Sequence, residues 1–212
     1  MPTQSGGMEI IMKVLFKDKC SYEERYSKYT TEVSGDREYI VPDKSSGKVS
    51  FCPFDAATDM VLDYLNIGFA AQNGIPTTDL VYDFVCKYGF PSRNDKRLAI
   101  ADFAEDARML YLHFNEAEST PYPDEPDFVL ETDPVPAIVK VENNQKFIEW
   151  QTAGLSGTIE LAYALLLCNR PKAIGICKHC GTPFYTKNPK SEFCSPPCRN
   201  RYNVYKSRAK NK

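Results

Sequence analysis

The chain has 212 residues, of which 42% are hydrophobic and 25% charged, a balance typical of a folded domain with a substantial core. No apolar run approaches the ~20 residues that a membrane-spanning helix needs, and the polar start MPTQSGG lacks the apolar segment of a secretion signal. We therefore expect a cytoplasmic protein that does not contact a membrane.

The net charge of −2 conceals a division between the two ends of the chain. Residues 171–212 contain ten Lys and Arg but only one acid, Glu192, so their local charge is +9 and residues 1–170 carry −11. We expect an α+β body over residues 1–170 and a basic unit over residues 171–212. Because an acidic body repels polyanions, only the basic unit would approach one.

The first part of the body is expected to consist of strands. Residues 8–17, MEIIMKVLFK, are rich in residues that favour strands. Residues 22–49 alternate loosely and contain the turn signal SGD at residues 34–36, which predicts a hairpin or meander closed by Pro42. Six tyrosines between residues 22 and 82 would either pack on strand faces, the commoner use, or form a stacking platform for bases.

Three amphipathic helices are expected in the middle of the body. The first would be capped by Asp55 and run to about Asn73, and the second would be capped by Thr77 or Thr78. The third would run from Asp95 to Glu118. The side chains expected to point inward from the second helix are Leu80, Val81, Phe84 and Val85.

A proline-rich acidic segment then separates these helices from the rest of the body. Residues 119–136 are expected to form a surface loop, or an internal mimic of DNA. Residues 137–142 and 146–151 would pair as a hairpin around an Asn-Asn turn, with Trp150 anchored on the core. A last apolar helix should start at Ser156 or Thr158, end near Asn169 and be buried centrally.

The last 36 residues open with a C-x2-C pair, thirteen intervening residues and a C-x3-C pair. Thiolates are favoured zinc ligands, and Gly181 would allow the positive φ of a turn after the first pair. We predict one structural Zn²⁺, held by a knuckle, a hairpin within residues 182–193 and a helix with Cys198 in its first turn. Unrelated buried thiols are the alternative. The expected ligands are Cys177, Cys180, Cys194 and Cys198.

The other four cysteines are scattered along the body. They are expected to be reduced, buried and hydrophobic in character rather than members of disulfides. These residues are Cys20, Cys52, Cys86 and Cys168.

After the last cysteine the chain reads RNRYNVYKSRAKNK, in which cations alternate with tyrosines and no acid intervenes. Phosphate backbones attract such a segment through counterion release. We therefore expect contact with nucleic acid, a solvated basic tail being the alternative. Asn200 would pair with adenine or form a hydrogen bond with the backbone of the zinc-binding segment itself. The residues expected to bind are Arg199, Asn200, Arg201, Tyr202, Tyr205, Lys206, Arg208 and Lys210.

Residues 194–201, CSPPCRNR, follow CKHCGTPF and resemble the CGNR-type zinc finger of bacterial proteins described as transcriptional regulators. They are also similar to treble-clef fingers that read FCSxxCRxxxYxxR. The four cysteines match that family's zinc ligands, and Asn200 and Arg201 match its closing Asn-Arg pair, whereas Arg199 replaces the glycine. The resemblance covers residues 177–212. It implies a DNA-binding finger attached to a domain that senses a small molecule or dimerises.

No catalytic pattern accompanies these features. The chain has two histidines, of which His113 is expected to be structural and His179 to face solvent. Four thiolates would leave zinc no open position for a substrate. The H-x-E of zinc deaminases, a P-loop, H-E-x-x-H and G-x-S-x-G are all missing from the sequence. We expect a protein without enzymatic activity.

The expected fold is α+β: a mainly helical body with short N-terminal strands and a hairpin, followed by a treble-clef-like zinc finger. The expected function is that of a bacterial transcriptional regulator that binds double-stranded DNA. Two alternatives remain open: an RNA-binding protein whose tyrosines stack on unpaired bases, and a protein-interaction module whose zinc is only a structural staple.

Overall fold

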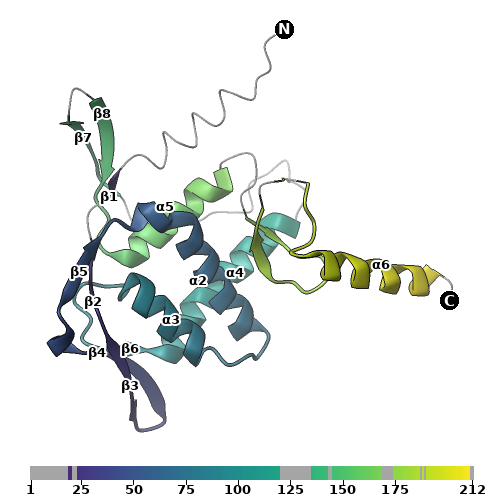
Figure 1. Ribbon diagram of the computed structural model, residues 1–212, viewed down its shortest axis with the longest axis horizontal. Helices are drawn as coiled ribbons and strands as arrows, with labels where there is room; N and C mark the ends of the chain where they lie inside the picture. Colours follow the sequence, from purple (N-terminus) through teal and green to yellow (C-terminus); the bar gives the residue numbers. More distant parts are fainter. Residues whose placement is uncertain are drawn as a thin grey trace.

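The computed structural model describes residues 19–20, 23–119, 135–142, 145–168, 174–186, 188 and 190–210. Three expected features therefore lie wholly or largely outside the described residues: the strand at 8–17, the loop at 119–136 and the turn at 143–144. The boundary expected between residues 170 and 171 also falls outside them. The described chain is mixed α and β, with helices at its centre and short strands around them (Figure 1).

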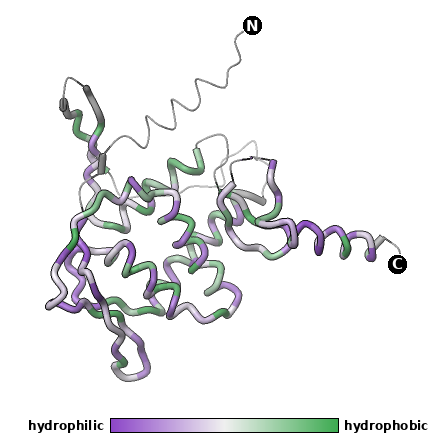
Figure 2. Tube along the Cα trace, viewed as in Figure 1, coloured by the Kyte–Doolittle hydropathy of each residue, from purple (hydrophilic) through white to green (hydrophobic). Residues whose placement is uncertain are grey.

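Four helices form the body's core, which confirms the helical centre expected from periodicity. α2 packs against the other three, and its Gly68 is the point of closest approach to α4, because a Cβ there would lie 2.1 Å from the carbonyl oxygen of Ala107. The apolar segments concentrate in these helices (Figure 2). They are α2 (Ala57–Gln72), α3 (Thr78–Tyr88), α4 (Ile100–Ser119) and α5 (Leu155–Cys168).

The helix starts differ from those expected. Asp55 does not cap α2, because it lies in a 3₁₀ turn, Pro53–Ala56, and Ala56 occupies the cap position. Thr77 is at the cap position of α3 but makes no side-chain capping bond, and the hydroxyl of Thr78 donates instead to Glu38. α4 begins five residues later than expected, because β6 (Leu98–Ala99) precedes it as a strand.

The expected β-hairpin near the N-terminus is present. β3 (Tyr29–Ser34) pairs antiparallel with β4 (Arg37–Pro42), and the two strands meet at a turn in which Gly35 has a φ of 67°. β4 also pairs with β6. Of the tyrosines considered as a stacking platform, Tyr29 and Tyr64 are buried in the core, which favours packing as their role.

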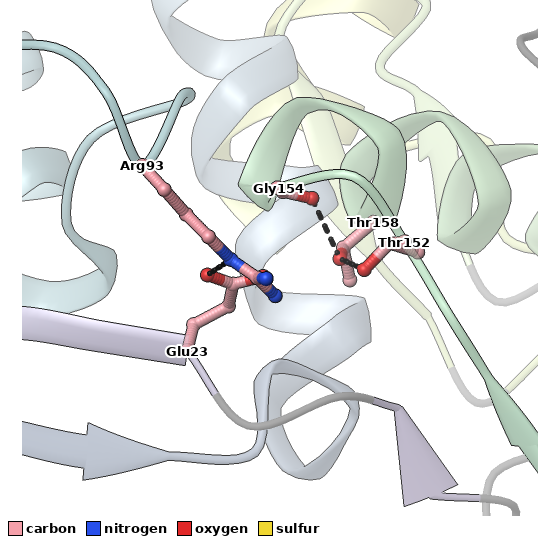
Figure 3. Close-up of polar contacts among 5 residues, drawn as sticks. All are labelled: Glu23, Arg93, Thr152, Gly154 and Thr158. Atoms are coloured by element: carbon pink, nitrogen blue, oxygen red, sulfur yellow. Dashed lines mark hydrogen bonds and ion pairs between the residues drawn. The ribbon is translucent and has the colours of Figure 1, made fainter.

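A second ribbon pairs β2 (Glu23–Tyr26) with β5 (Lys48–Phe51). The Glu23 carboxylate is buried and accepts two hydrogen bonds from Arg93, at 2.9 and 2.8 Å, which tie the ribbon to the loop after α3 (Figure 3). The same figure shows the start of α5, where Thr158 donates to the carbonyl of Gly154 and its hydroxyl lies 2.7 Å from that of Thr152. These buried polar groups are thus satisfied within the body.

The hairpin expected after the acidic segment is also present. β7 (Ala137–Glu142) pairs antiparallel with β8 (Gln145–Trp150), and β1 (Lys19–Cys20) pairs parallel with β8. The hairpin projects from the helices (Figure 1), while Trp150 at its base packs against the core.

Two further expectations concern side chains of the body. Leu80 does not point inward, because 39% of its surface is exposed, whereas Val81, Phe84 and Val85 are buried. Cys168 is exposed rather than buried. Cys52 and Cys86 are half-buried and pack against the core. Among the described helices, none combines the length and the apolar content needed to cross a lipid bilayer.

Candidate metal centre and basic helix

The first cysteine pair lies in the turn of a small hairpin. β9 (Ile174–Ile176) pairs antiparallel with β10 (Pro183–Tyr185), and the residues between them form the knuckle. Gly181 has a φ of 75°, as its position after the second cysteine predicts, and its N–H donates to the carbonyl of Cys177 at 2.8 Å. The hairpin was expected after the knuckle, within residues 182–193. Its first strand is instead β9, which precedes the knuckle, so the two strands lie on either side of it.

The second pair is delivered by the start of α6 (Pro196–Lys210). Ser195 precedes the helix, and its hydroxyl accepts a hydrogen bond from the backbone N–H of Cys198, in the manner of an N-cap. Two prolines open the helix, where their missing N–H groups cost nothing. Cys198 thus lies in the first turn of α6, as expected, and Cys194 lies just before it.

The four thiols converge on one point. Their Sγ atoms all lie within 4.8 Å of one another, and the pairs among Cys180, Cys194 and Cys198 are separated by 3.5 to 3.9 Å. A tetrahedral zinc ion with Zn–S bonds of about 2.3 Å requires sulfur atoms about 3.8 Å apart. The cluster is therefore suited to hold a metal ion.

The thiols have unequal proton affinities. Burial raises the pKa of Cys177, but hydrogen bonds from the backbone around Cys194, Cys180 and His179 outweigh it and lower the pKa to about 6. Burial and the neighbouring thiols raise the pKa of Cys194 to about 12. Thiols this close resist joint ionisation, whereas a cation among them would favour the thiolate form of each.

This finger, residues 174–210, is docked on the body. Ile174 is buried in the body's core, and the hydroxyl of Tyr111 on α4 donates to the carbonyl of Gly181 at 3.2 Å. The ring of Phe69 on α2 stacks edge-on against Tyr111 and lies against Gly181. The knuckle thus has a polar and an apolar contact with two core helices.

α6 extends away from both the body and the knuckle (Figure 1). It carries five cations and no acid, and Figure 2 shows it as largely hydrophilic. The side chains of Arg199, Asn200, Arg201, Lys206 and Arg208 are exposed, whereas the side chain of Lys210 lies outside the described residues. Most of the predicted contact residues are thus brought together on one protruding element.

The two tyrosines of α6 contact other aromatic rings of the finger. Tyr202 is half-buried, and its ring centroid lies 5.2 Å from that of Phe193. Tyr205 is 58% exposed but stacks on His179, with ring centroids 5.8 Å apart. His179 is therefore half-buried beside the helix instead of facing solvent. The sequence pattern did not indicate this pairing, because the two residues are distant along the chain.

The finger's single acid is neutralised locally. Glu192 accepts a hydrogen bond from Lys178 of the knuckle, and this lysine lowers the pKa of Glu192. The cations of α6 therefore face no unpaired carboxylate within the described part of the finger.

The body also has a cleft of about 630 Å³ between the β2–β5 ribbon and the loop after α3. Four cations converge on it from different segments, beside aromatic rings. The cations are Lys44, Lys48, Arg93 and Lys96, and the rings are those of Tyr26, Tyr29, Tyr88 and Phe90. Glu23, Glu24 and Asp95 also line it, so several of these charges are already paired.

No protein-family model, curated protein or solved structure matches this chain. Membership of the CGNR-type family therefore stays a prediction from residues 177–212. The candidate metal site is supported by the convergence of the four thiols, and the basic helix by its charge and exposure.

Proposed function

We propose that this protein is a DNA-binding transcriptional regulator whose finger holds one structural Zn²⁺ on Cys177, Cys180, Cys194 and Cys198. The observation that carries the proposal is α6: a helix with five cations and no acid, which begins at the metal cluster and projects away from the acidic body. A metal at its first turn would fix the direction in which the helix presents its charge.

Zinc suits this cluster because a set of four thiolates in tetrahedral spacing favours zinc or iron–sulfur centres over harder cations. A knuckle inside a hairpin, joined to the first turn of a helix, corresponds to a treble-clef arrangement. Four protein ligands fill the coordination shell, so the ion would have a structural role and no open position for a substrate. Reduced thiolates also favour a place in the cytoplasm.

Duplex DNA suits α6 better than RNA does. An α-helix with its side chains is about 10–12 Å across, which matches the major groove of B-DNA at about 12 Å. The corresponding groove of double-stranded RNA is too narrow for side chains to read. The ring of Tyr202 supports the same choice, because it is half-buried against Phe193 and is therefore less available to stack on an unpaired base.

The body would regulate the finger. The 630 Å³ cleft, with its lysines and aromatic rings, is the place that we assign to a small-molecule ligand. A single finger reads only a few base pairs, so we also propose that two copies act together on DNA. The acidic body would keep DNA contact confined to α6.

Salt-dependent binding of a labelled short duplex tests the proposal. Replacing Arg201 and Arg208 together by Ala should weaken binding and reduce the slope of log K against log salt by up to ~1.8, since each lost phosphate contact is worth ~0.9. Replacing Lys28 and Arg97 by Ala removes the same charge from exposed positions on the body outside the cleft and should change neither quantity.

Equal slopes for both double variants and the parent protein would show that α6 is not the contact surface. Tighter binding to single strands or to an RNA hairpin would favour the RNA-binding alternative. Failure to bind any of these probes at about 50 mM salt, where phosphate contacts are strong, would favour the third alternative, a protein-interaction module whose zinc only stabilises the fold.

A further inference from the structure

The contacts of α6 define which side of the helix faces the finger. Cys198 belongs to the metal cluster, Tyr202 packs on Phe193, and Tyr205 stacks on His179. These three residues recur at i, i+4 and i+7, which places them on one side of a helix with about 3.6 residues per turn. The opposite side of α6 therefore points away from the rest of the finger.

That outward side is uncharged. Asn200, Asn203, Val204 and Ser207 follow the spacing i, i+3, i+4 and i+7, so they form one continuous face. All four are exposed, and Val204 keeps 47% of its surface in solvent although it is apolar. Packing within the described finger gives Val204 no reason to be apolar.

Cations line both edges of this neutral face. Arg201 and Arg208, seven residues apart, lie along one edge, and Arg199 and Lys206, also seven residues apart, lie along the other. A helix with two charged edges and a neutral centre matches the cross-section of a DNA groove, in which phosphates form the two walls and base edges form the floor.

We infer that α6 lies in the major groove of duplex DNA with its Asn200–Asn203–Val204–Ser207 face on the base edges, and that this face prefers A·T pairs. The inference rests on the proposed function and adds sequence specificity to it. An Asn amide pairs with the N6 and N7 atoms of adenine, and the apolar side chain of Val suits the methyl group of thymine, whereas the hydroxyl of Ser can hydrogen-bond to any base edge.

The length of the face sets the size of the site. Residues 200 to 207 rise by about 10 Å along the helix at about 1.5 Å per residue. Base pairs are spaced by about 3.4 Å, so the face spans about three of them. The cationic edges contact phosphates whatever the sequence, and they therefore supply affinity without discrimination.

Selection from a pool of randomised duplexes by the zinc-loaded full-length protein tests this inference. We expect an enriched core of about three base pairs containing A·T. Asn203→Ala should reduce the preference for the selected duplex over a scrambled duplex by about 10-fold, and Val204→Ala should reduce it by less. Neither variant should change the salt slope. Gln151→Ala, which removes an exposed amide from the body outside the cleft, should leave the preference unchanged.

The outcomes separate this inference from the proposed function. Uniform binding to all duplexes, with a salt slope that depends on Arg201 and Arg208, would overturn base reading and leave DNA binding intact. An enriched G·C core whose preference is lost in the arginine variants would also overturn it, because the charged edges would then read the bases. Absence of duplex binding at low salt would overturn both.

Discussion

The body and the finger are held together in different ways. The body buries whole helix faces, and Val61, Leu65 and Ile67 of α2 are at most 1% exposed. In α6, by contrast, no side chain of the described residues is buried. The body is thus stabilised by apolar burial, whereas α6 gains little from it, and we propose that the finger relies on a metal in its cysteine cluster and on its contacts with α2 and α4.

This difference suggests that the two parts respond to different perturbations. A segment as short as the finger buries too little apolar surface to fold by itself, so metal binding would supply much of its folding free energy. The body, in contrast, has a large apolar core of its own. The contacts of Gly181 with Tyr111 and Phe69, together with the burial of Ile174 in the core, are places where one part can influence the other.

Removal of the metal should have the largest effect. Structural zinc contributes roughly 10–16 kcal/mol to small zinc fingers, so we expect a strong chelator, or Cys177→Ser, to unfold the finger while the helices of the body remain. Hydrogen exchange measured peptide by peptide would show loss of protection over residues 174–210 alone.

Cys168→Ser is the matched control, because this exposed cysteine lies at the end of α5 outside the cluster. It should bind one equivalent of zinc, as the parent protein should. Less than half an equivalent in the parent, or chelation that unfolds both parts together, would contradict the separation of body and finger.

A cavity in the body should have the next largest effect. Phe84 is 2% exposed and contacts the rings of Tyr64, Tyr88 and Phe103. Phe84→Ala should lower the free energy of unfolding of the body by about 3–5 kcal/mol in urea titrations, without changing the zinc content.

Leu80→Ala, on the same helix, is the control for this change. Leu80 is 39% exposed, so its truncation should cost less than about 1 kcal/mol. Loss of zinc from the Phe84 variant under conditions in which the body is still folded would show that the finger depends on the packing of α3.

The junction between the two parts should respond to a smaller change. Tyr111→Phe removes the donor to the carbonyl of Gly181 and should cost about 0.5–1.5 kcal/mol. We expect faster hydrogen exchange in residues 174–185, with the body unchanged. Tyr82→Phe removes a comparable bond, to the carbonyl of Tyr29, within the body. The same exchange pattern in both variants would argue against Tyr111 as a specific link.

The smallest effect concerns pH and the body alone. Burial lowers the pKa of His113, whose Nδ1 lies 2.7 Å from the hydroxyl of Tyr163. As the pH falls, the unfolded chain therefore binds a proton at His113 at a higher pH than the folded chain does. This histidine should leave the stability unaffected above about pH 6.5 and lower it as the pH drops below that value. His113→Gln should reduce this slope in urea titrations at several pH values, and an identical slope would exclude His113 as the source.

Much of the fold could be predicted because its signals are local. The alternating residues and turn glycine of β3–β4, the apolar periodicity of α2 and α3, and the spacing of four cysteines all depend on neighbours in the chain. Two of the errors arose where a distant partner competes. Leu98 pairs with β4 and so delays α4, and Ile174–Ile176 pairs with β10 and so moves the finger's hairpin around the knuckle.

The candidate site was predicted unevenly for the same reason. The four cysteines follow from their spacing, and the charge of α6 can be read directly from the chain. The stacking of Tyr205 on His179 and the pairing of Glu192 with Lys178 depend on how the knuckle faces the helix. These contacts turn a run of exposed residues into a helix with an inner and an outer side.

By itself, the sequence determined the chemistry of this protein: which residues can hold a metal, where the cations gather, and which segments favour helix or strand. Those properties belong to side chains and their immediate neighbours. Only the tertiary structure decided orientation. It brought the thiols within 4.8 Å, placed Gly181 against Phe69 and Tyr111, and turned one face of α6 outward, because each of these results depends on packing between segments far apart in the chain.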